Sequence, residues 1–191
     1  RASDPLGLLS PETLMLTVLV DGTVPEMIVN QPTGTHANGS QSVRLSFGDV
    51  HLTEFSTSIK RVADGVTIAS IHGTQSTTIN LLELNNQAEG EYQLFAEARD
   101  GAGNRSEREH GFFLDKTAPL VSLAVPVENA VLAGNLSTPV RGSVSDDRLD
   151  SYTLAVAPQS VENWTELASG TSALADAEIL SWRPNLSDGP Y

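Results

Sequence analysis

Apolar and polar residues alternate along several segments of this chain. The alternation is strict in Val43–Phe47 and Tyr152–Val156, and it has a single slip in Glu91–Ala98. A period of two residues is typical of a β-strand that buries one of its faces. An acidic residue followed by Gly, as in Asp21-Gly22 and Asp100-Gly101, separates such segments and is typical of tight turns. Short strands with frequent turns between them predict an all-β chain of antiparallel β-sandwiches.

An internal repeat runs through the chain. Asp21–Pro25 and Asp115–Pro119 share the pattern Asp-x-Thr-x-Pro and lie 94 residues apart. Residues 43–46 and 140–143 also match each other, as Val-Arg-x-Ser, at an offset of 97 residues. Self-similarity at a nearly fixed period is typical of proteins that are built from tandem modules.

The repeat predicts three parts along the chain. Residues 1–20 are expected to form the terminal hairpin of an upstream module, residues 21–117 a complete sandwich, and residues 118–191 a sandwich that lacks its last strands. In a seven-stranded sandwich the sixth strand has a partner on each side, so a module without it would leave a sheet edge open. We therefore expect the polypeptide to continue beyond Tyr191 with an alternating strand and a hairpin.

Charge and the length of apolar stretches exclude two classes of partner. The chain has 11 Lys and Arg against 24 Asp and Glu, a formal net charge of −13. Such an acidic chain repels phosphate backbones, so nucleic acid is not expected as a partner. The uninterrupted apolar stretches are far shorter than the roughly 18–20 residues that cross a bilayer, so we expect no membrane insertion in this segment. Because the chain has no Cys, its stability must come from buried apolar side chains.

The segment Gly90–Asn104, followed by Phe112–Pro119, resembles the bacterial Ig-like (Big-type) repeats of large secreted and surface adhesin-like proteins. Those repeats contain a strand with the pattern Tyr-x-x-x-x-x-Ala-x-Asp-x-Ala-Gly-Asn and a linker with the pattern Asp-x-Thr-x-Pro, and both patterns occur here. The resemblance implies tandem Ig-like β-sandwiches and an extracellular or bacterial cell-surface location. It also implies neighbouring Ig-like modules of the same chain as partners, with any host-surface protein or glycan bound through other domains.

The expected function is that of a non-enzymatic structural spacer or adhesive segment of a large multidomain protein. The four His residues are scattered, and none lies in a motif of zinc-dependent or nucleophilic catalysis. Two alternatives remain open. The chain is either a carbohydrate-binding accessory module of a secreted enzyme, or an assembly module whose open last sandwich accepts a strand, with residues 11–20 as the candidate donor, from a neighbouring chain.

Acidic and amide side chains in the predicted loops are candidate calcium ligands. In an Ig-type topology two loops and the incoming linker share one pole, so oxygen atoms from separate segments converge there. The candidates are Asp21, Asp49, Asp100 and Asn104 at the first junction, and Asp115, Asp146 and Asp147 at the second. The alternative, which we favour, is that these side chains cap their own turns. The sandwich itself needs no cofactor to fold.

Three aromatic residues have specific expected roles. Trp164 and Trp182 are candidates for stacking on a carbohydrate. Trp182 lies in an alternating segment, and the core is favoured over the surface for it because Trp side chains are mostly buried. Tyr92 follows Gly90 and precedes a strand, which is the position of the tyrosine of an Ig-type tyrosine corner.

Overall fold

A computed structural model describes residues 3, 5–8, 15–159, 161, 163–186 and 189–191. These residues contain thirteen β-strands and no helix, which confirms the predicted all-β class. The chain divides into two compact units, Arg1–Lys116 (unit 1) and Thr117–Tyr191 (unit 2). Among the described residues, no helix is present that is long and apolar enough to cross a membrane.

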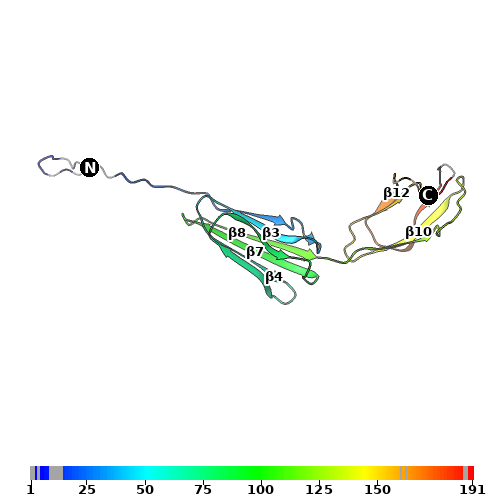
Figure 1. The fold of residues 1–191 in the computed structure, drawn as a ribbon, viewed down its shortest axis with the longest axis horizontal. Helices are drawn as coiled ribbons and strands as arrows, with labels where there is room; N and C mark the ends of the chain where they lie inside the picture. Colours follow the sequence, from blue (N-terminus) through cyan, green and yellow to red (C-terminus); the bar gives the residue numbers. More distant parts are fainter. Residues whose placement is uncertain (1–2, 4, 9–14, 160, 162, 187–188) are drawn as a thin grey trace. The chain divides into compact units, whose positions relative to one another are not determined.

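Unit 1 is a sandwich of two sheets (Figure 1). The smaller sheet has the order β1–β3–β6, and the larger has the order β2–β8–β7–β4–β5. Their bounds are β1 Glu26–Gln31, β3 Ser42–Gly48 and β6 Thr77–Glu83 in the first, and β2 His36–Ala37, β8 Arg105–Leu114, β7 Gly90–Asp100, β4 Leu52–Arg61 and β5 Thr67–Gly73 in the second. All pairs are antiparallel except β2 with β8. This arrangement is that of an Ig-like sandwich.

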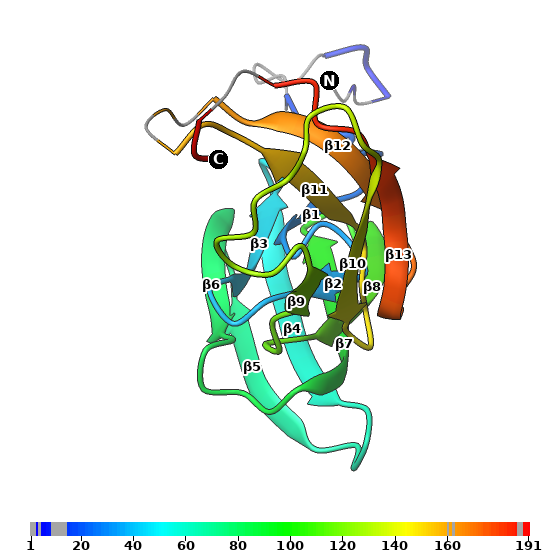
Figure 2. The same ribbon diagram turned by 90° about the vertical axis from the view of Figure 1, so that its right-hand side faces the viewer.

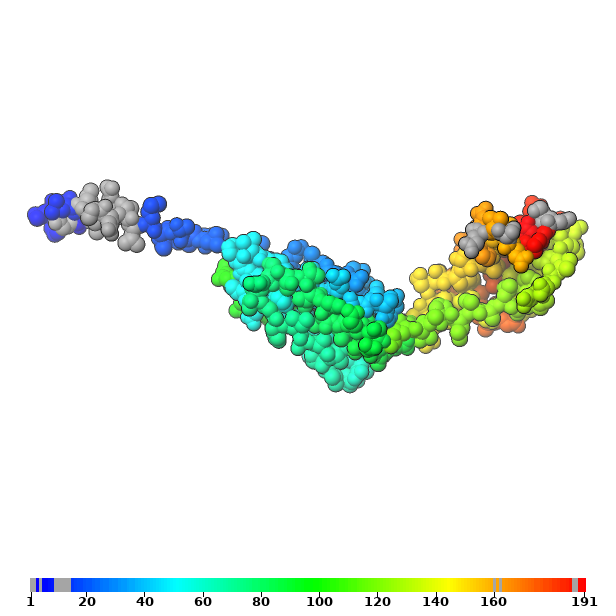
Figure 3. All heavy atoms as spheres, in the orientation of Figure 1, coloured from blue at the N-terminus to red at the C-terminus, as the bar shows by residue number. Residues whose placement is uncertain are grey.

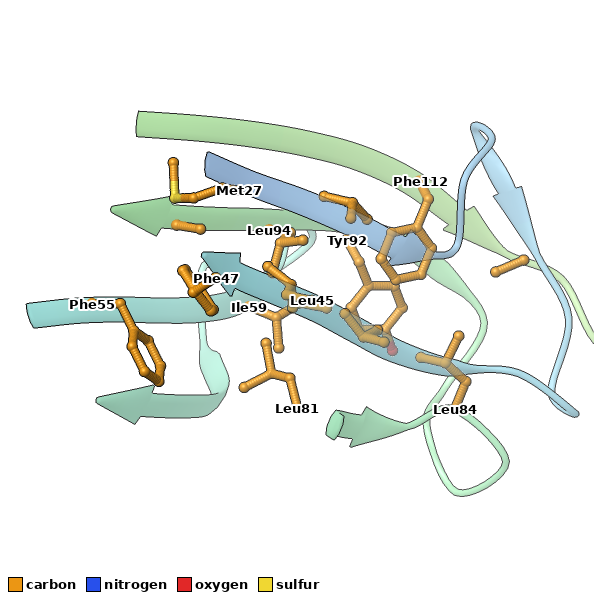
Figure 4. Packing of buried hydrophobic residues seen from close by; sticks show 14 of the residues in the cluster. Met27, Leu45, Phe47, Phe55, Ile59, Leu81, Leu84, Tyr92, Leu94 and Phe112 are labelled. Carbon is orange, nitrogen blue, oxygen red and sulfur yellow. The ribbon is translucent and has the colours of Figure 1, made fainter. Parts of the chain in front are cut away.

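The core of unit 1 follows from the alternation in the sequence. In β3 the buried residues are Val43, Leu45 and Phe47, and every second residue of β7 from Tyr92 onward is buried in the same way. Figure 4 shows these side chains meeting those of the facing sheet, where Phe47 stacks on Phe55 with 4.2 Å between ring centroids. The two alternating faces therefore pack against each other and exclude water, which stabilises the unit.

Tyr92 forms the tyrosine corner that its position predicts. Its hydroxyl donates a hydrogen bond to the carbonyl of Ala88 at 2.6 Å, and the residue is 1% exposed. Its ring stacks on Phe112 with 5.5 Å between centroids. Burial raises the pKa of the Tyr92 phenol, which therefore stays a neutral donor. This contact fixes the start of β7 to the preceding loop.

Unit 2 contains five strands in two sheets (Figure 2). One sheet has the order β13–β10–β9 and the other pairs β11 with β12. The bounds are β9 Leu120–Val125, β10 Thr138–Ser145, β13 Leu174–Trp182, β11 Tyr152–Val156 and β12 Thr165–Gly170. Among the described residues of this unit, the buried hydrophobic side chains are Val140, Val144 and Ala157, against sixteen in the core cluster of unit 1. The core of unit 2 is therefore small.

The strands of unit 2 correspond in order to five strands of unit 1. The sheet β9–β10–β13 matches β1–β3–β6, and the pair β11–β12 matches β4–β5. Each unit also has a cis peptide bond just after its first strand, before Pro32 and before Pro126. Within the described residues, unit 2 has no counterpart of β7 and β8. As a result β11 has a strand on one side only, whereas β4 lies between β5 and β7.

The predicted upstream hairpin over residues 1–20 is only partly described. Residues 1–2, 4 and 9–14 lie outside the described part of the chain. Residues 15–20 are described and belong to no strand. In Figure 3 the blue atoms that precede β1 form a narrow thread, and the apolar side chains of residues 15–20 are 68–90% exposed.

Candidate functional site

The candidate site lies where two loops of unit 1 meet the linker before β1. The loop between β3 and β4 carries Asp49 and His51. Asp100 is the last residue of β7, and Asn104 lies in the loop that follows it. The two loops are joined by a hydrogen bond from the backbone N–H of Gly101 to the carbonyl of His51, at 2.9 Å. We call the cluster of Asp21, Asp49, His51, Asp100 and Asn104 the linker pole.

Asp100 organises the loop between β7 and β8. One of its carboxylate oxygens accepts hydrogen bonds from the backbone N–H groups of Ala102 and Asn104, at 2.9 and 2.8 Å, and the residue is only 2% exposed. Burial by itself raises the pKa of this carboxyl, but hydrogen bonds from Asn104, Ala102 and Gly103 outweigh it and hold the pKa below its ordinary value. Asp100 is therefore ionised at neutral pH and caps its own turn.

Asn104 connects that loop to the linker. Its side-chain amide donates to the second carboxylate oxygen of Asp100 at 2.7 Å, and to the backbone carbonyls of Asp21 and Thr23 at 3.2 and 3.0 Å. Two residues further on, the hydroxyl of Ser106 donates to the carbonyl of Pro25 at 2.7 Å. These contacts fix the linker to the sandwich over the five residues from Asp21 to Pro25.

His51 and Asp21 form a second contact between loop and linker. The Nδ1 atom of His51 lies 2.7 Å from a carboxylate oxygen of Asp21, whose side chain is 13% exposed. The backbone N–H of Thr23 donates to the other oxygen of Asp21 at 3.0 Å. The hydrogen bond from Thr23, followed by that from His51, holds the pKa of Asp21 below its ordinary value. Asp49 caps its own loop by accepting the N–H of His51 at 2.7 Å.

Three side chains at this pole are close enough to share a metal ion. One ligand atom from each of Asp21, Asp49 and His51 lies within 4.8 Å of the others. Calcium takes about six to eight oxygen ligands, whereas an imidazole nitrogen suits transition metals. Oxygens of both carboxylates already accept the hydrogen bonds described above, and the amide nitrogen of Asn104 faces the cluster. These side-chain atoms fit a network of hydrogen bonds between the loops and the linker better than they fit a calcium site.

Addition of calcium is therefore expected to leave the melting temperature of unit 1 unchanged, because an ion would have to displace hydrogen bonds from ionised carboxylates. Calorimetric titration with calcium chloride, together with melting curves in calcium and in magnesium, measures this. A rise in melting temperature with calcium that magnesium does not reproduce would contradict the expectation and support a calcium site.

The second predicted ligand group is divided between the two units. Asp115 belongs to unit 1, and its backbone N–H donates to the carbonyl of Ala37 at 2.9 Å. Asp146 belongs to unit 2 and accepts the N–H of Arg148 at 2.7 Å, which repeats the turn that Asp49 and His51 form in unit 1. Asp147 is exposed in the same loop. Asp146 therefore serves as a turn cap.

The two tryptophans differ in exposure. Trp164 directly precedes β12, and 67% of its surface is exposed. Trp182 ends β13 and is half-buried, so it lies between the core and surface positions that its sequence pattern allows. Of the two, Trp164 is the one whose side chain is largely exposed to solvent.

Sequence reasoning did not select His51 as a member of the linker pole. The signal that points to it is its position two residues after Asp49, at the end of a predicted loop. Its contact with Asp21 spans 30 residues of sequence, and it depends on where the linker passes over the loop.

Comparison with known proteins finds similarity to solved structures alone. No family model matches the sequence, and no curated protein matches it significantly. Among solved structures, the chain is similar to the fibronectin(III)-like modules of CbhA from Clostridium thermocellum, with 18% identity, 83% of this chain and 78% of that chain covered, and a TM-score of 0.48. It is also similar to a tetra-tandem repeat in the extending region of a large adhesion protein, with 14% identity, 82% and 41% coverage, and a TM-score of 0.36. The chain thus spans less than half the length of that repeat structure.

Proposed function

We propose that this chain is a non-enzymatic spacer or adhesive segment of a large extracellular or surface-anchored bacterial protein. The observation that carries the proposal is the anchoring of the linker to unit 1 through Asn104, His51 and Ser106. A linker that is bonded to its module restricts the angle at which the preceding module joins. Its partners are neighbouring Ig-like modules of the same chain, and host-surface proteins or glycans would bind through other domains.

The segment that leaves unit 1 is anchored as well. The backbone N–H of Lys116 donates to a carboxylate oxygen of Glu89 at 2.7 Å, and its ammonium group donates to the carbonyl of Gln87 at 2.7 Å. These contacts lie at the start of β7, whereas the linker pole lies at its end. The eleven residues of β7 span about 33 Å. Tension applied to the two ends would therefore pass along the strands of the larger sheet.

Replacement of Asn104 by Ala is expected to release the linker and to lower the free energy of unfolding of unit 1 by about 1–2 kcal/mol, because the substitution removes hydrogen bonds to an ionised carboxylate and two carbonyls. NMR relaxation of the backbone amides of residues 21–24 and chemical denaturation measure the two effects. In the variant the order parameters of these linker amides are expected to fall, while those of the amides in β3 stay unchanged.

Asn135→Ala is the matched control, because Asn135 is exposed in the loop between β9 and β10 of unit 2. It is expected to change neither measurement. Unchanged order parameters of the linker amides in Asn104→Ala would refute the anchoring and, with it, the proposed spacer function.

A carbohydrate-binding accessory module is the second candidate function. It is supported by the exposure of Trp164, since an exposed indole is a suitable platform for stacking on a sugar ring. The half-burial of Trp182 leaves that platform without a second exposed tryptophan. We therefore place the spacer function first.

A further inference from the structure

The linker pole brings together metal-ligating side chains from two segments of unit 1. Asp21 lies in the linker before β1, whereas Asp49 and His51 lie in the loop between β3 and β4. One ligand atom of each residue lies within 4.8 Å of the other two. Among the described residues, no other group of three acidic or histidine side chains has this spacing. The set combines two carboxylates with an imidazole, which distinguishes it from a purely acidic surface.

The existing hydrogen bonds leave one oxygen of each carboxylate for a further ligand. In Asp21 the Oδ1 atom accepts the backbone N–H of Thr23 at 3.0 Å, and in Asp49 the Oδ1 atom accepts the backbone N–H of His51 at 2.7 Å. The Oδ2 atom of Asp21 faces the imidazole of His51, and the Oδ2 atom of Asp49 has no hydrogen-bond partner among the described residues. Backbone hydrogen bonds of this kind hold ligating carboxylates in a fixed orientation.

The imidazole of His51 supplies a nitrogen at the same place. Its Nδ1 atom lies 2.7 Å from Oδ2 of Asp21. An ionised carboxylate only accepts hydrogen bonds, so Nδ1 carries the hydrogen that lies between the two atoms. A cation that takes the place of this hydrogen leaves the ring neutral with its proton on Nε2. The side chain of His51 is 40% exposed, so an ion and its water can reach the position from solvent.

We propose that the linker pole binds one zinc ion through Asp21, Asp49 and His51, with water as the fourth ligand. Zinc takes four nitrogen and oxygen ligands at about 2.0–2.2 Å, which places tetrahedral ligand atoms roughly 3.3–3.6 Å apart. The present separations, of which one is 2.7 Å and none exceeds 4.8 Å, reach that range by shifts of roughly 1 Å. The two carboxylates also balance the charge of the ion.

The same geometry discriminates against calcium. Calcium takes about six to eight oxygen ligands and would compete for the oxygens that the backbone N–H groups of Thr23 and His51 already occupy. Zinc needs one oxygen from each carboxylate and accepts the imidazole nitrogen, which is a poor ligand for calcium. It therefore displaces the contact between His51 and Asp21 alone, and it replaces that contact with bonds that join the same two segments.

Zinc binding does not rest on the proposed spacer function, because it requires only the three side chains. The two hypotheses also have separate tests. The order parameters of the linker amides in Asn104→Ala are measured without metal, and they report on the hydrogen bonds of Asn104. The experiments below use chains in which Asn104 is unchanged.

Calorimetric titration of the 191-residue chain with zinc chloride, after bound metals have been removed with a chelator, is the first measurement. One zinc ion per chain is expected. The melting temperature of unit 1 is expected to rise by roughly 10 °C when free zinc is in hundredfold excess over its Kd. Calcium chloride is expected to produce neither effect. Absence of zinc binding, or an equal response to calcium, would overturn the inference.

Two substitutions at the site and one control test the ligands. His51→Gln removes the nitrogen ligand and is expected to weaken zinc binding by at least about tenfold. Asp49→Asn is expected to do the same, although its side-chain oxygen can still accept the backbone N–H of His51 and preserve the turn. His72→Gln is the matched control, because His72 is exposed in β5 and belongs to no such cluster among the described residues. It is expected to leave zinc affinity unchanged.

NMR of the histidine side-chain nitrogens identifies the ligating atom. Zinc is expected to shift the Nδ1 signal of His51 and to leave the ring signals of His36 and His72 in place. Zinc binding that is equally strong in the unsubstituted chain, His51→Gln and Asp49→Asn would overturn the inference. So would a loss of affinity in His72→Gln as large as that in His51→Gln, or a zinc-dependent shift at His72 and none at His51.

Discussion

Replacement of Leu94 by Ala is expected to lower the free energy of unfolding of unit 1 by about 2–5 kcal/mol. Leu94 is fully buried in β7, the strand that lies between β4 and β8, and its side chain points at the facing sheet (Figure 4). The substitution removes buried methyl groups and leaves a cavity that the two sheets on either side cannot fill without moving. No other substitution proposed for this chain is expected to cost as much.

Chemical denaturation followed by a probe in each unit measures this effect. The transition of unit 1 is expected to shift while that of unit 2 stays in place, since each unit has its own core. Leu19→Ala is the control, because Leu19 is 69% exposed and its truncation should cost less than about 0.5 kcal/mol. Equal effects of the two substitutions would show that β7 does not form the centre of the core.

Replacement of Gly142 by Ala is expected to destabilise unit 2 by about 2–3 kcal/mol. Gly142 is a buried residue of β10, and a Cβ atom there would lie 2.4 Å from the backbone oxygen of Ser122 in β9. Because the obstacle is a backbone atom in a paired strand, relief requires β9 to shift away from β10. The loss is large relative to a core that contains few buried hydrophobic residues.

Differential scanning calorimetry checks this result. For a unit of this size each kcal/mol corresponds to a fall in melting temperature of roughly 4–8 °C. Gly22→Ala is the matched control, because an added Cβ at Gly22 meets nothing within 4 Å. A melting temperature for unit 2 that does not change in Gly142→Ala would mean that β9 is not held against β10.

Local sequence patterns were sufficient to predict those features of the fold that involve a single strand and the residues next to it. Alternation in β3 and β7 predicted which residues are buried, because successive side chains of a strand point to opposite faces. The tyrosine corner at Tyr92 was also predictable, because its hydroxyl reaches only four residues back. By contrast β9, with the sequence Leu-Val-Ser-Leu-Ala-Val, has no clean alternation, and most of its residues are exposed.

At the linker pole, such local patterns predict the turns but not the contacts between segments that are distant in sequence. Turn capping by Asp49, Asp100 and Asp146 is local and follows from their position in loops. The bond from Asn104 to the carbonyl of Asp21 spans 83 residues, and it depends on three-dimensional placement that no short pattern encodes. The exposure of Trp164, which directly precedes β12, likewise follows from no short pattern in the sequence.

The bonds between Asn104 and the linker carbonyls have a consequence for how such chains can be recombined. The donor amide belongs to the body of the sandwich, and its acceptors belong to the peptide that leads into the same sandwich. A genetic exchange that cuts upstream of Asp21 transfers both halves together and preserves the joint. A cut after Pro25 keeps Asn104 and His51 but replaces Asp21, so the arriving sequence supplies backbone carbonyls for Asn104 and loses the carboxylate for His51 unless it carries an acidic residue at that position.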